Sequence, residues 1–490
     1  MTPTTGLVSF DDVQALLARA DPEQELTPCL IRRIDRGSGA IRSVAASVSA
    51  LLGPAPERGT GQPRVTMLVD KTLIRRRGED VKTLVEDQLR ERFGVHREVL
   101  DDGHRELHVT EEVVEAAAHA ATAGAAVVAV GGGTICDIAK LAAERARARA
   151  LVLVQTAASV DGYTDNVSVI LRDGVKRTVP SRWPDVVIAD AETIAGAPPV
   201  MNRAGYGEVT SMFTAPADWR LASLAGLDSS FRRGPIRLLE AVGSEIDAWS
   251  PGVAAADQDA VERLTWALAV RGIATGVAGT TACLSGVEHL VSHMLDLHHG
   301  ERGLPMGLHG AQVGVASVVA AAAWEMLADR MAKDAPGDID PAALDPTAAR
   351  DRVYGAFAEL DPTGRIGAEC WNDYSRKLRS CAERHAWFSR LLGDWPEHEP
   401  ELRALGRSSA RIAAGLRAAG SAVTFGDLTP AIPAGLARWA VENCALMRNR
   451  FTVVDLLTLL GWWRPEDVDE LFDRARASAR GTGAEVGHVG

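Results

Sequence analysis

Three consecutive glycines join an apolar strand pattern directly to a helical one near residue 130. The apolar run is Val127–Val130, and Gly131, Gly132 and Gly133 lead from it into a helical pattern at Thr134–Lys140. Glycines permit a tight turn with no Cβ in the way, and the exposed N–H groups of a first helical turn attract an anion. The sequence therefore predicts a phosphate-binding turn, with a dinucleotide pyrophosphate as its anion. The same turn can also serve only to pack a helix against a sheet, and it lacks the G-x-G-x-x-G spacing.

Strand and helix patterns alternate around this turn. Strands are expected at 65–70, 97–100 and 150–155, and helices at 81–93 and 111–123. Such alternation is typical of a parallel sheet covered by helices on both faces. Because ligands of these sheets bind at the carboxyl ends of the strands, the loop Thr156–Gly162 is expected at the same edge as the glycine turn.

The pattern becomes mainly helical after about residue 200. We therefore expect an α/β nucleotide-binding domain with a Rossmann-like parallel sheet, followed by an all-α domain. The predicted boundaries are an N-terminal appendage and linker at 1–60, the α/β domain at 61–200, the helical domain at 201–480 and a loose tail at 481–490.

Composition excludes several classes of protein. The 490 residues carry 53 basic and 65 acidic side chains, a formal net charge of -12, which disfavours a general nucleic-acid or acidic-membrane surface. No stretch reaches the roughly 20 uninterrupted apolar residues of a membrane span, and the N-terminus lacks a signal-peptide pattern, so a cytoplasmic location is expected. The six cysteines include no CxxC pair, which argues against a disulfide framework or a thiolate zinc site.

Five of the 12 histidines lie between positions 289 and 309. His289 and His293 are four residues apart, so on a helix they share one face and can converge on an ion or a substrate. His309 lies in the apolar segment Leu304–Gly310, where a histidine needs a partner. We predict a metal or substrate role for His289 and His309. His298 and His299 precede a polar loop and are expected to be solvated.

A divalent ion bound by imidazoles usually takes a carboxylate as well. The residues alone leave the choice open between four carboxylates: Glu208, Asp218, Asp161 and Glu288.

Five motifs follow one another in an order that resembles the sn-glycerol-1-phosphate dehydrogenase family. This family is part of a larger group with iron-dependent alcohol dehydrogenases and dehydroquinate synthases. The resemblance covers roughly residues 60 to 325, with a fainter echo at Arg450–Gly461. The motifs are Val130–Lys140, Thr156–Gly162, Gly205–Glu208 with Asp218-Trp219, Ser285–His293 and Leu308–Gly314.

The resemblance implies a dehydroquinate synthase-like fold, with the active site in a cleft between a nucleotide domain and a helical domain. It also implies a homo-oligomer and a role for each motif. Thr156 and Ser159 would contact the cofactor near its nicotinamide. The residues that would hold the pyrophosphate are Gly131, Gly132, Gly133, Thr134 and Ile135.

The remaining implied roles concern the metal and the substrate. Glu208, His289 and His309 would bind the metal, with Glu208 also near the substrate. Asp161 would bind a substrate hydroxyl, and His293 would face the substrate as a catalytic group. Zinc is the usual ion of the glycerol-phosphate branch, and Fe²⁺, Ni²⁺ or another divalent ion is the alternative.

The chain departs from the family pattern in three ways. Position 208 is Glu where the glycerol-phosphate branch has Asp. A glutamate with two histidines is the ligand set of dehydroquinate synthase-like cyclases, so this residue slightly favours that branch. Asp165 replaces a small hydroxyl residue that touches the cofactor, and a carboxylate there favours NAD over NADP. The chain is also longer than the family norm, through its N-terminal segment and extra helical segments around 330–420.

The sequence thus favours a metal-dependent NAD(P)-linked dehydrogenase that interconverts a small polyol or polyol phosphate and its ketone. One alternative is a sugar-phosphate cyclase that uses NAD transiently. It would need several basic residues around the phosphate, yet none follows His289 until Arg302. Lys176 and Arg177 could attract an anionic substrate or simply flank a solvated turn at Asp173-Gly174. The other alternative is a catalytically inactive binding relative.

Overall fold

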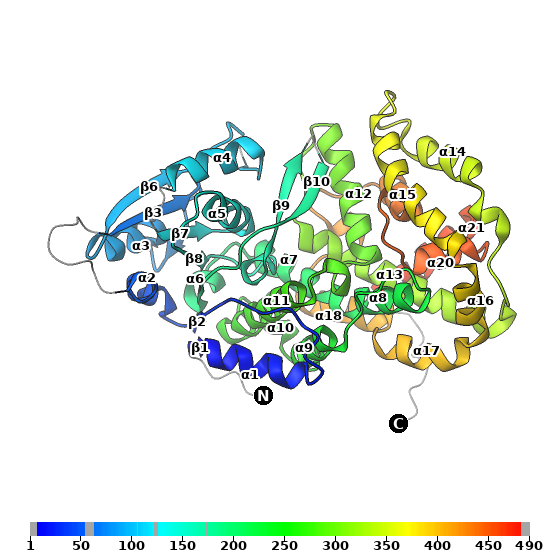
Figure 1. Ribbon diagram of the computed structural model, residues 1–490, viewed down its shortest axis with the longest axis horizontal. Helices are drawn as coiled ribbons and strands as arrows, with labels where there is room; N and C mark the ends of the chain where they lie inside the picture. The colour runs from blue at the N-terminus through cyan, green and yellow to red at the C-terminus, as the bar shows by residue number, and fades with distance from the viewer. Residues whose placement is uncertain (1–6, 54–62, 105, 122–125, 173–174, 482–490) are drawn as a thin grey trace. The chain divides into compact units, whose positions relative to one another are not determined.

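The computed structural model describes residues 7–53, 63–104, 106–121, 126–172 and 175–481 (Figure 1). The contacts divide the chain into two units. The first unit holds Met1–Gly205 and Arg233–Gly279, and the second holds Tyr206–Arg232 and Thr280–Gly490. The predicted linker at 54–61, the turn at Asp173-Gly174 and the tail after 481 fall outside the described residues.

A seven-stranded sheet organises the first unit. Its order is β1-β2-β11-β8-β7-β3-β6. Every neighbouring pair is parallel except β1 with β2, which is antiparallel. The parallel sheet predicted from the sequence is confirmed. The strands are β1 (Leu7–Ser9), β2 (Arg33–Gly37), β11 (Val186–Asp190), β8 (Ala150–Gln155), β7 (Ala126–Gly131), β3 (Arg64–Val69) and β6 (Gly94–Val99).

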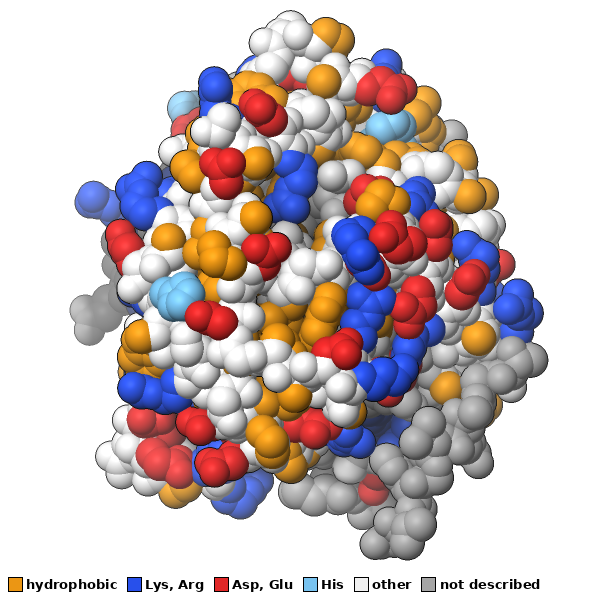
Figure 2. All heavy atoms as spheres, turned by 90° about the vertical axis from the view of Figure 1, so that its right-hand side faces the viewer, with side chains coloured by type: hydrophobic (Ala, Val, Ile, Leu, Met, Phe, Trp, Pro, Cys, Tyr) orange, Lys and Arg blue, Asp and Glu red, His pale blue; other side chains and the backbone are white. Residues whose placement is uncertain are grey.

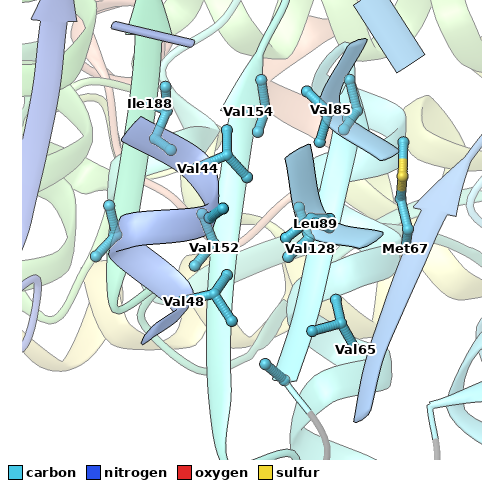
Figure 3. Close-up of a cluster of buried hydrophobic side chains, with 14 of the residues drawn as sticks. Val44, Val48, Val65, Met67, Val85, Leu89, Val128, Val152, Val154 and Ile188 are labelled. Atoms are coloured by element: carbon cyan, nitrogen blue, oxygen red, sulfur yellow. The ribbon is translucent and has the colours of Figure 1, made fainter. Parts of the chain in front are cut away.

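Helices cover both faces of this sheet, as the apolar strand sequences require. Helices α2 (Val44–Leu52) and α3 (Val81–Arg90) pack on one face, where Figure 3 shows their side chains meeting those of β3, β7, β8 and β11. Helices α4 (Glu111–Ala120) and α5 (Gly133–Arg145) lie on the other face (Figure 1). Each fully buried valine or leucine of such a cluster contributes about 1.5–3 kcal/mol relative to an exposed one.

The connections of the sheet reverse direction between β3 and β7. From β3 the chain passes through α3 to β6 at the edge, whereas from β7 it passes through α5 to β8 on the opposite side. In open α/β sheets, ligands bind at the carboxyl ends of two strands that diverge in this way. The glycine turn that follows β7 therefore lies at the switch point of the sheet.

The N-terminal segment is part of this unit. Strand β2 pairs with β11, and α2 packs its valines against β8 and β11. The segment expected as an appendage thus completes one edge of the sheet and covers one of its faces. The other helices of the unit are α1 (Phe10–Ala20), α6 (Ala191–Ala195), α9 (Arg233–Gly243), α10 (Ile246–Ala254) and α11 (Gln258–Ala278).

Two short antiparallel pairs accompany the main sheet: β4 (Arg75–Arg76) with β5 (Glu79–Asp80), and β9 (Val167–Arg172) with β10 (Val175–Pro180). Lys176 and Arg177 lie on β10.

The described residues of the second unit form helices and no strands. Helix α7 begins in the first unit and ends in the second. Helix α13 has the length and apolarity of a membrane span, but 78% of its most apolar window is buried inside the protein, as in a core helix. The helices are α7 (Pro199–Val209), α8 (Ala215–Leu224), α12 (Val287–Glu301), α13 (His309–Asp334), α14 (Pro346–Phe357), α15 (Arg365–Glu383), α16 (His385–Gly393), α17 (Trp395–Ala404), α18 (Ser409–Ala418), α19 (Ala434–Asn443), α20 (Val453–Leu459) and α21 (Pro465–Arg480).

Charged side chains of both signs lie close together on the face shown in Figure 2. Ion pairs join charges of opposite sign in the second unit, as between Arg474 and Asp329 at 2.7 Å. This face therefore does not present an extended basic surface.

A buried ion pair joins α5 to the start of β9. Lys140 is fully buried, and its Nζ donates to Asp165 Oδ1 at 2.6 Å, to the carbonyl of Gly162 at 2.7 Å and to the carbonyl of Val167. Burial raises the pKa of Asp165 to about 7, and the charge of Lys140 opposes this rise. Asp165 is thus engaged by Lys140 inside the protein.

We expect Lys140→Ala to destabilise the protein strongly, because it leaves the Asp165 carboxylate buried without its cation. Removing one partner of a buried pair costs about 3–5 kcal/mol. The measurement is the free energy of unfolding in chemical denaturation. The matched control is Arg476→Ala, which breaks an exposed 2.9 Å pair with Asp473 and should cost less than about 1 kcal/mol. Equal stability of the two variants would contradict a structural role for Lys140.

Candidate functional site

The three glycines of the turn differ in what surrounds them. A Cβ at Gly131 would lie 2.6 Å from Ile135 Cγ1, and one at Gly133 would lie 2.7 Å from Val160 Cγ2. A Cβ at Gly132 would meet nothing within 4 Å, and the backbone there has φ -81° and ψ -170°, which any residue adopts. Packing thus accounts for Gly131 and Gly133. At Gly132 the missing side chain leaves open space over the N-terminus of α5, a cradle that suits a phosphate.

The loop after β8 is fixed next to this turn. Tyr163 donates its hydroxyl to the carbonyl of Gly131 at 2.9 Å, and Asn202 Oδ1 accepts from the Ala158 N–H at 3.0 Å. Thr156 and Ser159 are buried in the same loop. The structure therefore brings together the glycine turn and the loop predicted to contact the cofactor.

Asp161 forms an ion pair that the sequence does not predict. Its Oδ2 lies 3.0 Å from Nη2 of Arg271, which is fully buried on α11. Asp161 keeps 20% of its side chain exposed. No local signal in the sequence connects the two residues, because Arg271 follows more than a hundred positions later. Asp165, which is expected at the cofactor, is 5% exposed and bonded to Lys140.

Glu208, His289 and His309 converge in the second unit. Each offers one ligand atom, and these atoms all lie within 4.8 Å of one another. His289 Nε2 is 3.3 Å from Glu208 Oε1, and His309 Nε2 is 3.8 Å from Glu208 Oε2. Ligand atoms bound tetrahedrally at ~2.1 Å from one ion lie ~3.4 Å apart, so the donor set fits a small divalent metal. Of the four carboxylates left open by the sequence, Glu208 is the one that meets both histidines.

A close approach of two helices places Glu208 beside His309. A Cβ at Gly207 would lie 2.2 Å from the carbonyl oxygen of Gly310, and one at Gly314 would lie 2.7 Å from the Gly207 Cα. Only glycines at 207 and 314 allow the end of α7 to pack this closely on the first turns of α13.

Both histidine rings are held through their Nδ1 atoms. His289 Nδ1 is 3.0 Å from Glu288 Oε1, and His309 Nδ1 is 2.9 Å from Ser292 Oγ. Ser292 donates its hydroxyl to Gln312 Oε1 at 2.6 Å, so it accepts from the Nδ1–H of His309. Each ring thus turns its Nε2 toward Glu208. Metal-binding histidines are held in this way by partners outside the ligand set.

The charges around His289 favour a cation at this point. Burial lowers the pKa of His289, but its contacts with Glu208 and Glu288 outweigh burial and raise the pKa to about 9. The pKa of Glu288 is lowered, because the contact with His289 outweighs burial. The contacts that favour a proton on this imidazole would also favour a bound divalent ion.

The other histidines separate into two groups. The half-buried ring of His293 lies 5.9 Å from that of His309 and 6.3 Å from that of His289, between ring centroids. His298 and His299 lie at the far end of α12, where burial lowers both pKa values. The expectation that His299 is solvated is wrong: it is 4% exposed, because α12 continues to Glu301 and turns this ring inward.

Asp218 and Arg450 bind the backbone around the start of α12, the helix that carries His289. Asp218 accepts from the Val453 N–H at 2.9 Å and from the Val287 N–H at 3.1 Å. Arg450 donates to the carbonyl of Ser285 and to Thr281 Oγ1 at 2.7 Å. The faint motif echo at 450–461 is thus explained by contacts that hold the start of α12.

The chain is similar to known dehydrogenases in sequence and in fold. A family model described as iron-containing alcohol dehydrogenase matches residues 42–198. The glycerol-1-phosphate dehydrogenase [NAD(P)+] of Natronomonas pharaonis is 34% identical over 332 residues, which cover 66% of this chain and 85% of that relative. The enzyme of the same name from Halalkalibacterium halodurans is 29% identical, over 44% of this chain and about half, 53%, of that relative.

Solved structures share the fold at low sequence identity. A probable glycerol dehydrogenase from Sinorhizobium meliloti superposes with a TM-score of 0.53 at 16% identity, covering 91% of this chain and 97% of that one. Maleylacetate reductase from Agrobacterium tumefaciens gives a TM-score of 0.52 at 17% identity, over 93% of this chain and 98% of that one. With the sequence match to the Natronomonas enzyme, the chain belongs to the glycerol-1-phosphate dehydrogenase family, within the iron-containing alcohol dehydrogenases.

Proposed function

We propose that the chain is a metal-dependent, NAD(P)-linked dehydrogenase that interconverts a small polyol or polyol phosphate with its ketone. The observation that carries the proposal is the convergence of Glu208 with two histidines whose Nε2 atoms face it. Relatives named for NAD(P)-linked oxidation of glycerol 1-phosphate supply the reaction class. We further propose a homo-oligomer on the family resemblance alone, and the cytoplasmic location expected from the sequence stays a prediction.

Glu208, His289 and His309 would hold the metal ion. A divalent ion held there would supply Lewis-acid chemistry toward an alcohol or ketone oxygen, and a bound nicotinamide cofactor would supply hydride-transfer chemistry. Imidazole and carboxylate donors suit both zinc, expected from the resemblance, and iron, for which the wider family is named.

The remaining groups would position the cofactor and the substrate and move a proton. Gly132 leaves room for a pyrophosphate, and Thr156 and Ser159 lie on the adjoining loop. Asp161 would accept a hydrogen bond from a substrate hydroxyl. His293 lies next to both ligand histidines, and a half-buried imidazole suits proton transfer near neutral pH. The preference for NAD over NADP rests on the negative charge of Asp165, which Lys140 offsets at 2.6 Å. This preference therefore stays a prediction.

Net turnover of the cofactor tests the proposal. The purified protein is analysed for metal, and its oxidation of NADH and NADPH is followed with ketones that do and do not carry a phosphate. We expect oxidation that stops after chelation and returns with a divalent ion. A sugar-phosphate cyclase, for which Glu208 is the favouring residue, would restore its NAD and show no net oxidation. Undiminished turnover after complete metal removal would contradict the proposal.

Substitutions of His309 and His293 are expected to affect different functions: the first metal binding, the second proton transfer. His309→Ala should lose the bound metal, because its Nε2 faces Glu208. His293→Ala should keep the metal and lose about 10²–10⁴-fold in kcat, the usual worth of a general acid or base. Metal content after gel filtration and kcat are measured on both variants, with circular dichroism as the control for folding. Equal metal content in the two variants would refute these roles.

The cradle at Gly132 gives a separate test of cofactor binding. Gly132→Ala places a methyl group where nothing lies within 4 Å, so we expect unchanged thermal unfolding. The methyl would occupy the pyrophosphate position and raise the Kd for NADH about tenfold or more, a cost of about 1.4 kcal/mol. Gly131→Ala is the control: its Cβ would lie 2.6 Å from Ile135 Cγ1 and should lower stability. Wild-type NADH affinity of Gly132→Ala would exclude the turn as the pyrophosphate site.

A further inference from the structure

Glu288 lies one residue before the proposed metal ligand His289 and is fully buried. Its Oε1 accepts from the Gly286 N–H at 2.6 Å and contacts His289 Nδ1 at 3.0 Å. Its Oε2 accepts from the Thr214 hydroxyl at 2.8 Å. Donors thus occupy both oxygens, and the carboxylate is held in one orientation.

Sequence proximity alone does not produce this contact. Consecutive residues of a helix point about 100° apart and do not face each other. Here the Glu288 side chain folds back over the N-cap residue Gly286, where a Cβ would lie 3.1 Å from Glu288 Oε2 and 2.4 Å from Asp218 Oδ2. The glycine at 286 provides the space in which the carboxylate reaches Nδ1 of the ring.

The two ligand histidines have unequal partners. His309 Nδ1 donates to a neutral hydroxyl, Ser292, which is linked to the neutral amide of Gln312. His289 Nδ1 contacts a carboxylate, which Arg450 also faces electrostatically from within the protein. A charged acceptor binds an imidazole N–H more strongly than a neutral one and makes the opposite ring nitrogen a better donor.

We propose that Glu288 is the positioning residue of the metal centre: its carboxylate orients His289 and strengthens the bond of its Nε2 to the ion. This inference rests on the proposed function, because it takes His289 as a ligand. Burying a carboxylate is costly unless it is paired, and the pairing with His289 is the compensation.

The test compares Zn²⁺ affinity among variants of the full-length protein by competition with a chromophoric chelator. Glu288→Gln keeps the size and the hydrogen-bonding oxygen but removes the charge, and we expect Zn²⁺ binding 10–100-fold weaker. Ser292→Ala, at the neutral partner, should lose less. The matched control is Asp296→Asn, a buried carboxylate on the same helix, which should bind Zn²⁺ as the wild type does.

A second readout separates positioning from a merely structural role. With Co²⁺ in place of Zn²⁺, the visible absorption of Glu288→Gln should shift, because the donor strength of His289 changes, while Asp296→Asn keeps the wild-type spectrum. Thermal unfolding of the metal-free proteins is followed alongside. Wild-type Zn²⁺ affinity and an unchanged Co²⁺ spectrum in folded Glu288→Gln would overturn the inference.

The outcomes also distinguish this inference from the proposed function. If neither the wild type nor any variant binds Zn²⁺, the metal site itself fails and the inference with it. If the wild type binds, His309→Ala does not, and Glu288→Gln binds as the wild type does, only the inference fails. Should Glu288→Gln not fold, Thr214→Val removes only the hydroxyl that fixes Oε2. That variant should bind Zn²⁺ several-fold more weakly, and wild-type affinity would overturn the inference.

Discussion

The close packing of α7 against α13 determines where the ligands of the second unit can meet. Two glycines, Gly207 and Gly314, let the backbones approach so closely that a Cβ at 207 would lie 2.2 Å from a carbonyl oxygen. Glu208 follows on α7, and His309 is the first residue of α13, so this contact sets the distance between their side chains. Any residue larger than glycine at 207 would separate the carboxylate from the imidazole.

Electrostatics reinforces what this packing arranges. The site collects two buried carboxylates, Glu208 and Glu288, on either side of His289. Buried carboxylates without a counter-charge are unstable, and the two contacts raise the pKa of His289 to about 9. The same excess of negative charge would attract a divalent ion. Helix α12 thus carries both the proposed ligand His289 and the carboxylate that we propose makes it a stronger donor.

The sequence predicts the local parts of this architecture better than the distant ones. Alternating strand and helix patterns predict the parallel sheet, and the spacing of His289 and His293 predicts one helix face. The contacts of Arg271 with Asp161 and of Asp218 with Val453 join residues that are far apart in the chain and carry no periodic signal. Likewise, strand β2 is short and Arg-rich, and only its pairing with β1 and β11 reveals its place in the sheet.

The glutamate at 208 raises the question whether the family's metal site survives in this chain. One added methylene lengthens the side chain by about one C–C bond, so a carboxylate aimed at the aspartate position would overshoot the ion. In the structure its two oxygens lie 3.3 and 3.8 Å from the two Nε2 atoms, close to the ~3.4 Å separation of tetrahedral ligands. The longer side chain thus faces both imidazole rings. An inactive relative would be free to lose this convergence, and its retention together with the Nδ1 contacts favours a working metal centre.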